Sequence, residues 1–369
     1  MHRRIRVLLL YGGRSAEHDV SRVSAVAAAT ALDPTRYEVV PVGITRDGRW
    51  LLGGSAQRAI DAGSSSLPDA FEVAGDEVSP AGIGDTRRSD RPSALADVDV
   101  VLPLIHGPFG EDGTIQGLLE LAGVPYVGSG VVGSAVGMDK VMMKRAFVAC
   151  GLPVARGFEL RDSHAGAELV ARVEREVGYP CFVKPANMGS SVGVSKVRDR
   201  AALQRAVDLA LAYDEWALVE ESIDGREIEV GVLGDDPPEA SEVGEIVPGD
   251  EFYTYADKYE HGTAQLRAPA PLTPDERAEV RALAIRAFEA CRCEAMARVD
   301  FFFEEQGRGF LVNEINTIPG FTPISMFPRL WALSGVPYPK LLDRLIELAF
   351  ERHARRARHA GRQRPELDR

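Results

Sequence analysis

The first 44 residues alternate between apolar runs and a segment of small residues. Residues 4–11 form a mainly apolar run that ends in two glycines, which is typical of a buried parallel strand. Residues 18–32 are rich in Ala and Val and stop before an Asp-Pro pair, as a helix does, and residues 37–44 form a second apolar run. A β-α-β unit of this kind predicts a parallel sheet with a binding site at the carboxyl ends of its strands.

The rest of the chain predicts a mixed α/β protein. A buried strand is expected over residues 98–105, and residues 53–94, rich in Gly, Ser, Pro and Asp, are interpreted as a surface insertion. The remaining strands are expected over residues 181–184, 193–197, 216–220, 227–233, 297–303 and 310–315. The remaining helices are expected over residues 114–122, 138–150, 165–177, 200–212, 274–290 and 338–354.

Length and charge narrow the class of protein. A chain of 369 residues is long enough for two or three domains, and its 45% hydrophobic and 27% charged residues indicate a soluble globular protein. A formal net charge of −12 disfavours a protein that binds the nucleic acid backbone. The apolar runs are too short or too rich in glycine for a secretion signal or a membrane span. The four cysteines lack zinc-site spacing, which indicates reduced thiols in a cytosolic protein.

The segment over residues 298–321 places polar side chains on one face of a predicted hairpin. Alternate residues of a strand share a face, so Arg298 and Asp300 point the same way, as do Glu314 and Asn316. If the two strands pair, one sheet face presents an arginine, two carboxylates and an amide. Hard oxygen ligands of this kind suit Mg²⁺ shared with phosphates, and an adjacent arginine stabilises oxyanion charge. The alternative is a solvated hairpin face with a salt bridge, which does not account for the amide.

Two further segments carry polar residues at predicted strand ends. Over residues 182–194, a strand ends in Lys184 and is followed by a Gly-Ser-Ser loop, whose small residues let backbone N–H groups approach phosphate oxygens. Over residues 216–230, a strand ends in an acidic pair, which can accept hydrogen bonds from an adenine amino group or from ribose hydroxyls. Taken alone, the first pattern is equally that of an ordinary β-hairpin turn, and the second is better interpreted as an exposed acidic turn.

The order of these features along the chain resembles one enzyme family. A lysine on a strand, a glycine-rich loop, an acidic strand end, and then Asp and Glu-x-Asn on a hairpin is the order in which ATP-grasp enzymes assemble a nucleotide site. HGPFGEDGTIQG at residues 106–117 and the segment 298–320 are similar to signatures of the D-alanine–D-alanine ligases, and GGRSAEHDVS near the start resembles their N-terminal motif. The resemblance covers about residues 4–350, apart from the segment 53–94.

The resemblance implies catalytic roles for residues at matching positions. Glu17 would hold the ammonium group of the first D-alanine, and Ser190 and Tyr259 would join it in a hydrogen-bonded set over the site. Arg298 and the backbone N–H of Gly320 would form an oxyanion site for the tetrahedral intermediate.

Other residues are implied to bind substrate, nucleotide and metal. Ser325 would bind the carboxylate of the second D-alanine, and His106 would lie beside the first, with a hydrogen-bonded structural histidine as the alternative. Lys140 and Lys184 would contact the nucleotide phosphates, and Lys258 the transferred phosphoryl group. The other residues implied to bind ATP are Ser190, Ser191, Glu220, Glu221, Ile223 and Glu227. The implied ligands of two Mg²⁺ ions, for which Mn²⁺ would substitute, are Asp300, Glu314 and Asn316.

The same resemblance implies a fold and a reaction. An N-terminal parallel α/β domain over 1–138 would precede an ATP-grasp fold of two α+β subdomains over 139–215 and 216–352, and a basic tail over 353–369 would be disordered. ATP would convert one D-alanine to an acyl phosphate, and the amine of a second D-alanine would displace the phosphate. The D-alanyl-D-alanine formed would enter peptidoglycan precursors. The enzyme would be a cytoplasmic homodimer that takes small-molecule substrates and has no nucleic acid or membrane partner.

Three alternatives stay open on the sequence alone. Another ATP-grasp ligase, with D-lactate or D-serine as its second substrate, would share most of these motifs. The β-α-β opening is also found in nucleotide-binding oxidoreductases, although the segment 12–15 departs from G-x-G-x-x-G and a redox enzyme needs no Asp/Glu/Asn cluster. A non-catalytic ATP-binding module would be expected to lack some of the ligands that this sequence carries.

Overall fold

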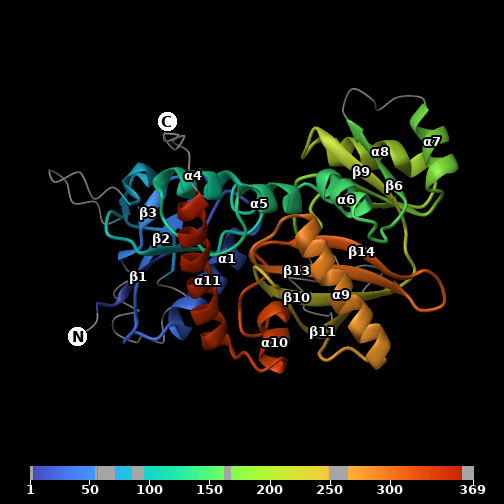
Figure 1. The fold of residues 1–369 in the computed structure, drawn as a ribbon. Coiled ribbons are helices and arrows are strands. Elements are labelled where there is room, and N and C mark those ends of the chain that lie inside the picture. Colours follow the sequence, from blue (N-terminus) through green and yellow to red (C-terminus); the bar gives the residue numbers. More distant parts are fainter. Residues whose placement is uncertain are drawn as a thin grey trace, which may run out of the picture.

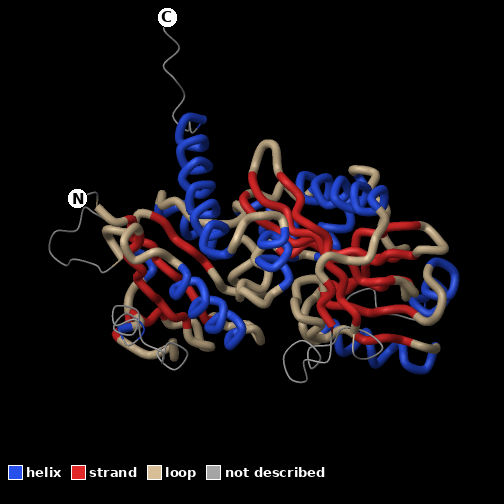
Figure 2. Tube along the Cα trace, turned by 90° about the horizontal axis from the view of Figure 1, so that it is seen from below, coloured by secondary structure: helices blue, strands red, loops and turns tan. Residues whose placement is uncertain are grey.

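The computed structural model describes residues 3–54, 56, 71–84, 95–161, 168–248 and 265–359. An N-terminal domain lies beside two further sheets, one of which stands above the other in Figure 1. Seen from below in Figure 2, the molecule is elongated, with the N-terminal sheet at one end. Among the described helices, none combines the length and the apolar character that a membrane span requires.

The N-terminal domain is built on a sheet with the strand order β4-β3-β2-β1-β5. Its elements are β1 Ile5–Gly12, α1 His18–Ala31, β2 Tyr37–Ile44, β3 Trp50–Leu52, β4 Asp76–Glu77, the 3-10 helix Pro80–Gly82, β5 Val100–Pro103, α4 Thr114–Ala122 and α5 Val131–Met138. Strand β1 pairs in parallel with both β2 and β5, while β3 and β4 add antiparallel strands at the edge. The predicted parallel β-α-β opening is therefore confirmed. The carboxyl ends of β1 and β5 lie side by side, which brings the loops that follow them together.

Part of the segment 53–94 belongs to the protein core. Strand β4 pairs with β3, and Phe71 is completely buried with its ring centroid 5.1 Å from that of Tyr11 on β1. The interpretation of the whole segment as a surface insertion is thus wrong for Phe71 and Ile83, while residues 72–82 between them are exposed or half-buried. Phe71 is an isolated aromatic residue among many Gly, Ser and Asp residues, so the local sequence does not predict its burial. Its burial depends on β1, which is distant in the sequence.

The next sheet is antiparallel and has the order β6-β9-β7-β8. Its elements are β6 Gly157–Arg161, α7 Glu168–Glu176, β7 Cys181–Pro185, β8 Ser195–Val197, α8 Arg200–Leu211 and β9 Trp216–Glu221. Because β9 pairs with both β6 and β7, it belongs to this central sheet. The predicted boundary between residues 215 and 216 would separate β9 from its partners, so the sheet places the division after Glu221.

The C-terminal sheet has the order β12-β11-β10-β13-β14 and is also antiparallel. Its strands are β10 Arg226–Gly234, β11 Glu239–Val247, β12 Gln265–Arg267, β13 Ala295–Glu304 and β14 Gly309–Asn316. The associated helices are α6 Lys140–Ala149, α9 Pro274–Ala290, α10 Met326–Leu333 and α11 Tyr338–His359. The side chains of α9 and the inner face of this sheet form one buried cluster, which includes Ile228, Val230 and Phe301. The opposite face of β10, β13 and β14 is left to present polar residues.

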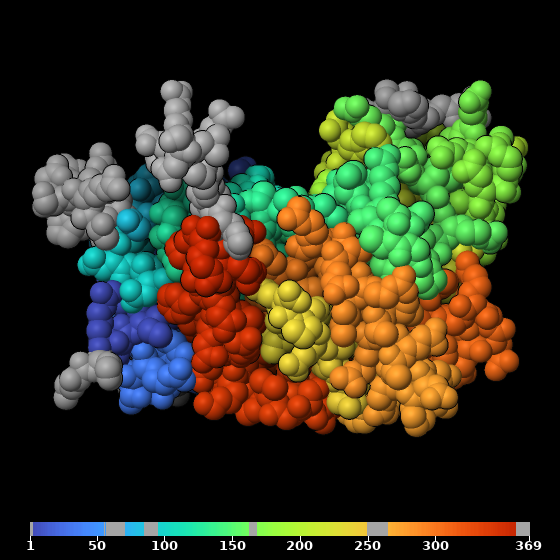
Figure 3. Space-filling model, viewed as in Figure 1, coloured from blue at the N-terminus to red at the C-terminus, as the bar shows by residue number. Residues whose placement is uncertain are grey.

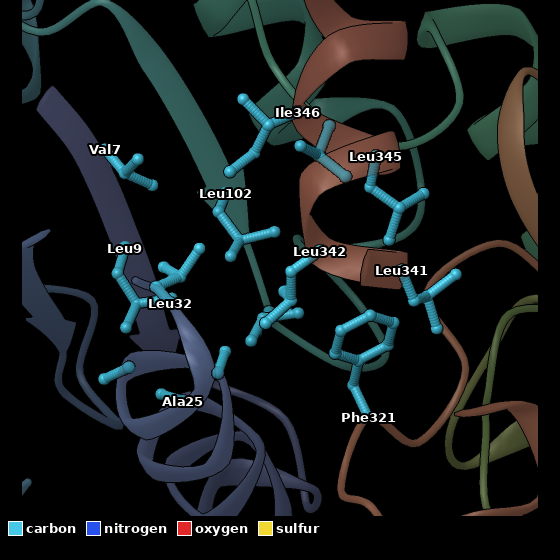
Figure 4. Close-up of a cluster of buried hydrophobic side chains, with 14 of the residues drawn as sticks. Val7, Leu9, Ala25, Leu32, Leu102, Phe321, Leu341, Leu342, Leu345 and Ile346 are labelled. Atoms are coloured by element: carbon cyan, nitrogen blue, oxygen red, sulfur yellow. The ribbon is translucent and has the colours of Figure 1, made fainter. Parts of the chain in front are cut away.

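Helix α11 joins the N-terminal domain to the C-terminal sheet. Its residues Leu341, Leu342 and Leu345 are fully buried in one cluster with residues of β1 and β5, and Leu342 lies on the side of the helix that faces β5 (Figure 4). Phe321 lies in the same cluster, so the loop before α10 is anchored to this core. In the space-filling view of Figure 3, α11 fills the space between the N-terminal domain and the C-terminal sheet.

The last turns of α11 correct the prediction of a disordered tail from residue 353. The helix continues to His359, and Arg352 donates hydrogen bonds to the backbone oxygens of Tyr126 and Gly128. The next basic residues form ion pairs with acidic residues of the N-terminal domain and the C-terminal sheet: Arg355 with Asp235 and Glu294, and Arg356 with Glu120 and Glu294. The arginine-rich composition therefore reflects a helix that fastens two domains, and residues 360–369 lie outside the described structure.

Candidate active site

A cavity of about 380 Å³ lies where the N-terminal domain, the central sheet and the C-terminal sheet meet. It brings together predicted residues that are up to 308 positions apart in the chain, from residue 17 to residue 325. The predicted residues that line it are Glu17, His106, Lys140, Ser190, Arg298, Glu314, Asn316, Gly320 and Ser325. The fold thus gathers the loops after β1, β5 and β7, the start of α6, and one face of the β13–β14 hairpin.

Glu17 lies at the start of α1 and faces the glycine-rich loop after β7. The hydroxyl of Ser190 donates a hydrogen bond to its carboxylate. A Cβ atom at Gly107 would lie 2.8 Å from Glu17 Oε2, and one at Gly189 would lie 2.9 Å from the same atom. The carboxylate therefore fits between two residues that lack side chains, with room beside it for an ammonium group in the cavity. Tyr259, the third predicted member of this set, lies outside the described residues.

The loop after β7 has the backbone of an anion-binding turn. Ser190 and Ser191 have φ angles of 49° and 59°, in the left-handed region that residues with side chains rarely adopt. Successive residues in such turns direct their N–H groups into one concavity, which suits phosphate oxygens. At the entrance of this loop, Lys140 donates a hydrogen bond of 2.6 Å to the backbone oxygen of Met188.

His106 is buried at the base of the cavity. Its Nδ1 donates to the backbone oxygen of Ile318 over 2.9 Å, which leaves Nε2 as the acceptor facing the Ser24 hydroxyl at 3.1 Å. Burial lowers the pKa of His106 in spite of the nearby Glu17 carboxylate, so the ring is neutral. The two hydrogen bonds of the ring therefore link the N-terminal domain to the loop before α10, and His106 also lines the cavity.

The hairpin of β13 and β14 presents the predicted metal ligands on one face. Asp300 lies directly opposite Glu314, and Arg298 opposite Asn316. Arg298 forms two hydrogen bonds of 2.7 Å to the two oxygens of Asp300, and the Asn316 amide donates to Asp300 over 2.9 Å. The predicted sharing of one face by these four residues is confirmed.

The donor set of this face fits a divalent cation that shares its shell with phosphates. It offers two carboxylates and an amide, all hard oxygen donors. Among the described residues, no three His, Cys, Asp or Glu side chains converge closely enough to bind a metal by themselves. Water and nucleotide oxygens would therefore complete the coordination, as is usual for Mg²⁺.

The loop between β14 and α10 also lines the cavity. Tyr338 on α11 donates a 2.7 Å hydrogen bond to the backbone oxygen of Phe321, next to Gly320. A Cβ atom at Gly320 would lie 3.3 Å from the hydroxyl oxygen of Ser325, which is the N-cap residue of α10. An anion between Gly320 and Ser325 would meet backbone N–H groups and the positive end of a helix.

Glu220, Glu221 and Lys184, which were predicted to bind the nucleotide, belong to the central sheet and do not line the cavity. Glu220 on β9 accepts bonds from Lys184 at 2.8 Å and from Lys144 at 2.9 Å. Burial raises the pKa of Glu220, but the two ammonium groups outweigh burial and hold that pKa at about 2. The carboxylate is therefore ionised, and it fixes the position of both lysines.

The remaining predicted nucleotide residues are only partly placed by the geometry. The carboxylate of Glu221 is engaged by Arg156 at 2.7 Å and by Arg308 at 2.6 Å, and its backbone N–H donates to the backbone oxygen of Arg156 at 2.9 Å. Ile223 follows β9, Glu227 is on β10, and neither lines the cavity, nor do Ser191 and Lys184. Lys258 lies outside the described residues.

Three residues of this region were missed in the sequence. Lys144 lies one helical turn after Lys140 on α6, a spacing that places both on one face of the helix. Glu111 and Glu229 line the cavity, and Glu111 accepts hydrogen bonds from the backbone N–H groups of Gly107 at 2.7 Å and Ile318 at 2.8 Å. Its place within the HGPFGEDG segment was the available signal, but its partner across the cavity is more than 200 positions away.

Replacing Glu111 by Gln is expected to change how stability depends on pH. Burial, together with the nearby Glu17 carboxylate, raises the pKa of Glu111 to about 8 from 4.5. Because the folded state holds this proton more tightly, the carboxyl group destabilises the fold as pH rises from about 4.5 to about 8, by about 1.4 kcal/mol per unit of pKa shift. Urea unfolding should be measured at pH 5, 7 and 9 for both proteins. The free energy of unfolding of the wild type should fall with rising pH relative to that of Glu111→Gln.

The control for this pH series is Glu120→Gln on α4. Burial alone would raise the pKa of Glu120, yet the ion pair with Arg356 lowers it, so this variant should differ from wild type by a constant amount over pH 5–9. Parallel pH curves for wild type and Glu111→Gln would show that the carboxyl of Glu111 does not hold a proton in this range.

The two antiparallel sheets around a lysine- and carboxylate-lined cavity define the ATP-grasp class. Family models described as D-ala D-ala ligase N-terminus and D-ala D-ala ligase C-terminus match residues 6–129 and 146–347. The chain therefore belongs to the D-alanine–D-alanine ligase family. Membership of this family excludes the oxidoreductase alternative that the β-α-β opening had left open.

Individual relatives agree over nearly the full length of the chain. The D-alanine–D-alanine ligase of Bacillus pumilus is 48% identical over 353 residues, covering 95% of this chain and 97% of the relative. That of Streptomyces avermitilis is 48% identical over 369 residues, with 95% of each chain covered. A solved D-alanine–D-alanine ligase from Coxiella burnetii has a TM-score of 0.81 at 36% identity, covering 98% of both chains. The VanG D-Ala:D-Ser ligase of Enterococcus faecalis has a TM-score of 0.81 at 31% identity, covering 94% of this chain and all of that one.

Proposed function

We propose that the protein joins two D-alanine molecules to form D-alanyl-D-alanine for peptidoglycan precursors, with ATP converted to ADP and phosphate through a D-alanyl phosphate. The observation that carries this proposal is the single cavity that holds a carboxylate for an ammonium group, Glu17, and the oxygen-ligand face of β13 and β14. Glu17, Glu314 and Asn316 all line this space, whose volume of about 380 Å³ suits small molecules. Family membership supplies the substrate class.

The carboxylate of the first D-alanine must be activated, because a carboxylate is a poor acyl donor. Glu17 would bind the ammonium group and orient the carboxylate toward the γ-phosphate of ATP, giving a D-alanyl phosphate. Lys140 and Lys184 would hold the nucleotide phosphates, and placing two anions in line for phosphoryl transfer requires such cations. Asp300, Glu314 and Asn316 would hold Mg²⁺, or Mn²⁺ in its place, which supplies neutralising charge for the phosphates when bound.

The second step is attack by an amine on the acyl phosphate. Ser325, at the start of α10, would bind the carboxylate of the second D-alanine and so direct its amine toward the acyl carbon. The tetrahedral oxyanion would be stabilised by Arg298 and by the backbone N–H of Gly320. Phosphate then leaves as the peptide bond forms.

The proposal is tested by mixing the protein with Mg-ATP and D-alanine, measuring phosphate release, and identifying the product by mass spectrometry. Parallel reactions should offer D-serine or D-lactate with D-alanine, because one similar solved structure is named as a D-Ala:D-Ser ligase. We expect D-alanyl-D-alanine as the main product in all mixtures. ADP formed without dipeptide would contradict the proposed reaction. A main product that joins D-alanine to D-serine or to D-lactate would instead identify that compound as the preferred second substrate.

We also propose, from the family resemblance, that the enzyme is a homodimer and acts in the cytoplasm. Light scattering during size-exclusion chromatography should give about twice the 40.0 kDa mass of one chain. A monomer mass at micromolar concentration would overturn the dimer.

A further inference from the structure

Glu229 extends the polar face of the hairpin to a third strand. On β10 it lies directly opposite Asp300 of β13, which in turn lies opposite Glu314 of β14. Three carboxylates therefore form a row across neighbouring strands, and the two outer ones, Glu229 and Glu314, line the cavity. Glu229 is buried, with only 6% of its surface exposed, so it can keep its charge only with a cation close by.

The cation beside Glu229 is Arg298. Its Nε lies 3.3 Å from Glu229 Oε2 and 2.7 Å from Asp300 Oδ1, so one guanidinium bridges two carboxylates on adjacent strands. Burial lowers the pKa of Arg298, but Asp300 and Glu229 raise it far more, and the guanidinium stays charged. The pair on Asp300 is the tighter of the two, with both guanidinium bonds at 2.7 Å.

Two cations, the Arg298 guanidinium and the proposed divalent metal ion, would compete for the carboxylate of Asp300. Asp300 holds Arg298 through both oxygens, and it is also a proposed ligand of the divalent cation. An Asp oxygen that turns to a metal ion weakens its bonds to the guanidinium, and a buried guanidinium without a carboxylate is strongly unfavourable. Glu229 is the carboxylate already within reach of Arg298 on the other side.

We propose that Glu229 is a positioning residue that retains the Arg298 guanidinium at the cavity wall when a divalent cation takes Asp300. Glu229 thereby lowers the free energy needed to release Asp300 to the metal, and it keeps the guanidinium where an oxyanion would form. The proposal rests on the proposed function for its metal and for the role of Arg298. Its geometric basis, the three-strand row, does not depend on which amino acids are joined.

The test measures Mn²⁺ affinity by electron paramagnetic resonance on the full-length protein with ADP. We expect Glu229→Gln to weaken Mn²⁺ binding by about tenfold or more, the range found when groups that orient metal ligands are removed. Glu229→Asp keeps the negative charge but shortens the side chain by one methylene, which moves the carboxylate away from Arg298. This variant should therefore bind Mn²⁺ more tightly than Glu229→Gln but less tightly than the wild type. The readout needs no D-alanine, so it stays informative even if the proposed ligation were wrong.

The matched control is Glu245→Gln. Glu245 is likewise a buried carboxylate of the same sheet and pairs with Arg226 at 2.7 Å, but it does not line the cavity. It should lose stability as Glu229→Gln does, with Mn²⁺ affinity unchanged.

A double-mutant cycle separates positioning from simple charge. If Glu229 acts through the guanidinium, Glu229→Gln should not weaken Mn²⁺ binding further in an Arg298→Met background. The same tenfold loss in that background would mean that Glu229 acts only through its own negative charge, and the proposal would be overturned. Mn²⁺ affinity unchanged in Glu229→Gln would overturn it as well.

Discussion

Glu314→Gln is expected to retain about a thousandth of the wild-type kcat/KM, a loss of about 4 kcal/mol of transition-state stabilisation. The glutamine keeps the shape of the side chain. It replaces the carboxylate that lies directly opposite Asp300, on the same face of the hairpin, by a neutral amide. It also removes the ion pair with Lys140, whose Nζ lies 4.0 Å from Glu314 Oε2. Both effects leave the phosphates of ATP less well neutralised when the phosphoryl group is transferred.

Steady-state kinetics with Mg²⁺ as the varied component provide the measurement. The control is Glu304→Gln at the far end of β13, where Glu304 pairs with Arg308 at 2.7 Å outside the cavity. We expect this control to keep kcat/KM within about twofold, because surface ion pairs of this kind contribute about 0–1 kcal/mol. Activity of Glu314→Gln within tenfold of wild type would remove Glu314 from the proposed metal site.

The local features of the site could be predicted because they follow the period of one element. Asp300 and Arg298 are two residues apart in a strand, and the Glu-x-Asn pair has the same spacing, so each pair shares a face whatever the partners are. Glu17 comes soon after a buried parallel strand, which places it at the carboxyl edge of the sheet.

Residues that act through distant partners could not be predicted in the same way. Glu229 alternates with Glu227 on β10, which on its own indicates an exposed strand face. Only the pairing of β10 with β13 brings Glu229 beside Arg298. Lys144 likewise depends on β9, which supplies Glu220 from another element of the fold.

The sequence did not predict the elements β3, β4, β6, β11, β12, α5 and α10. Of these, β11 and α10 illustrate the reasons. Strand β11 contains Glu239, Glu242 and Glu245, and a strand with three acidic residues lacks a clear apolar alternation. In the structure, Arg226 of the neighbouring strand pairs with Glu245 and makes its burial tolerable. Helix α10 is short and carries Pro328 in its first turn. Proline is compatible with a helix at that position but does not predict one.

Glu220→Gln is expected to lower the free energy of unfolding by about 3–5 kcal/mol, the range for removing one partner from a buried ion pair. Glu220 is 3% exposed, and its loss leaves the ammonium groups of Lys144 and Lys184 facing each other in a buried site. Urea unfolding in a background in which Trp50 and Trp331 are replaced by Phe, followed by the fluorescence of Trp216 on the same strand β9, would report the central sheet.

The pH dependence of this variant has a defined sign. The lysines hold the pKa of Glu220 at about 2 against the effect of burial, below its usual 4.5. A carboxylate with a lowered pKa stabilises the fold above about pH 4.5, and this contribution is lost as pH falls toward 2. The difference between wild type and Glu220→Gln should therefore be constant at neutral pH and shrink in acid.

A second substitution shows whether the cause is unpaired charge or lost packing. Lys144→Met combined with Glu220→Gln removes one of the two uncompensated ammonium groups, while Glu227 and Glu314 still raise the pKa of Lys184. The double variant should therefore be more stable than Glu220→Gln alone, because a paired removal avoids a buried lone charge. If the two losses simply add, the lysine–glutamate cluster holds the central sheet together by shape and hydrogen bonding, and its charge balance contributes little.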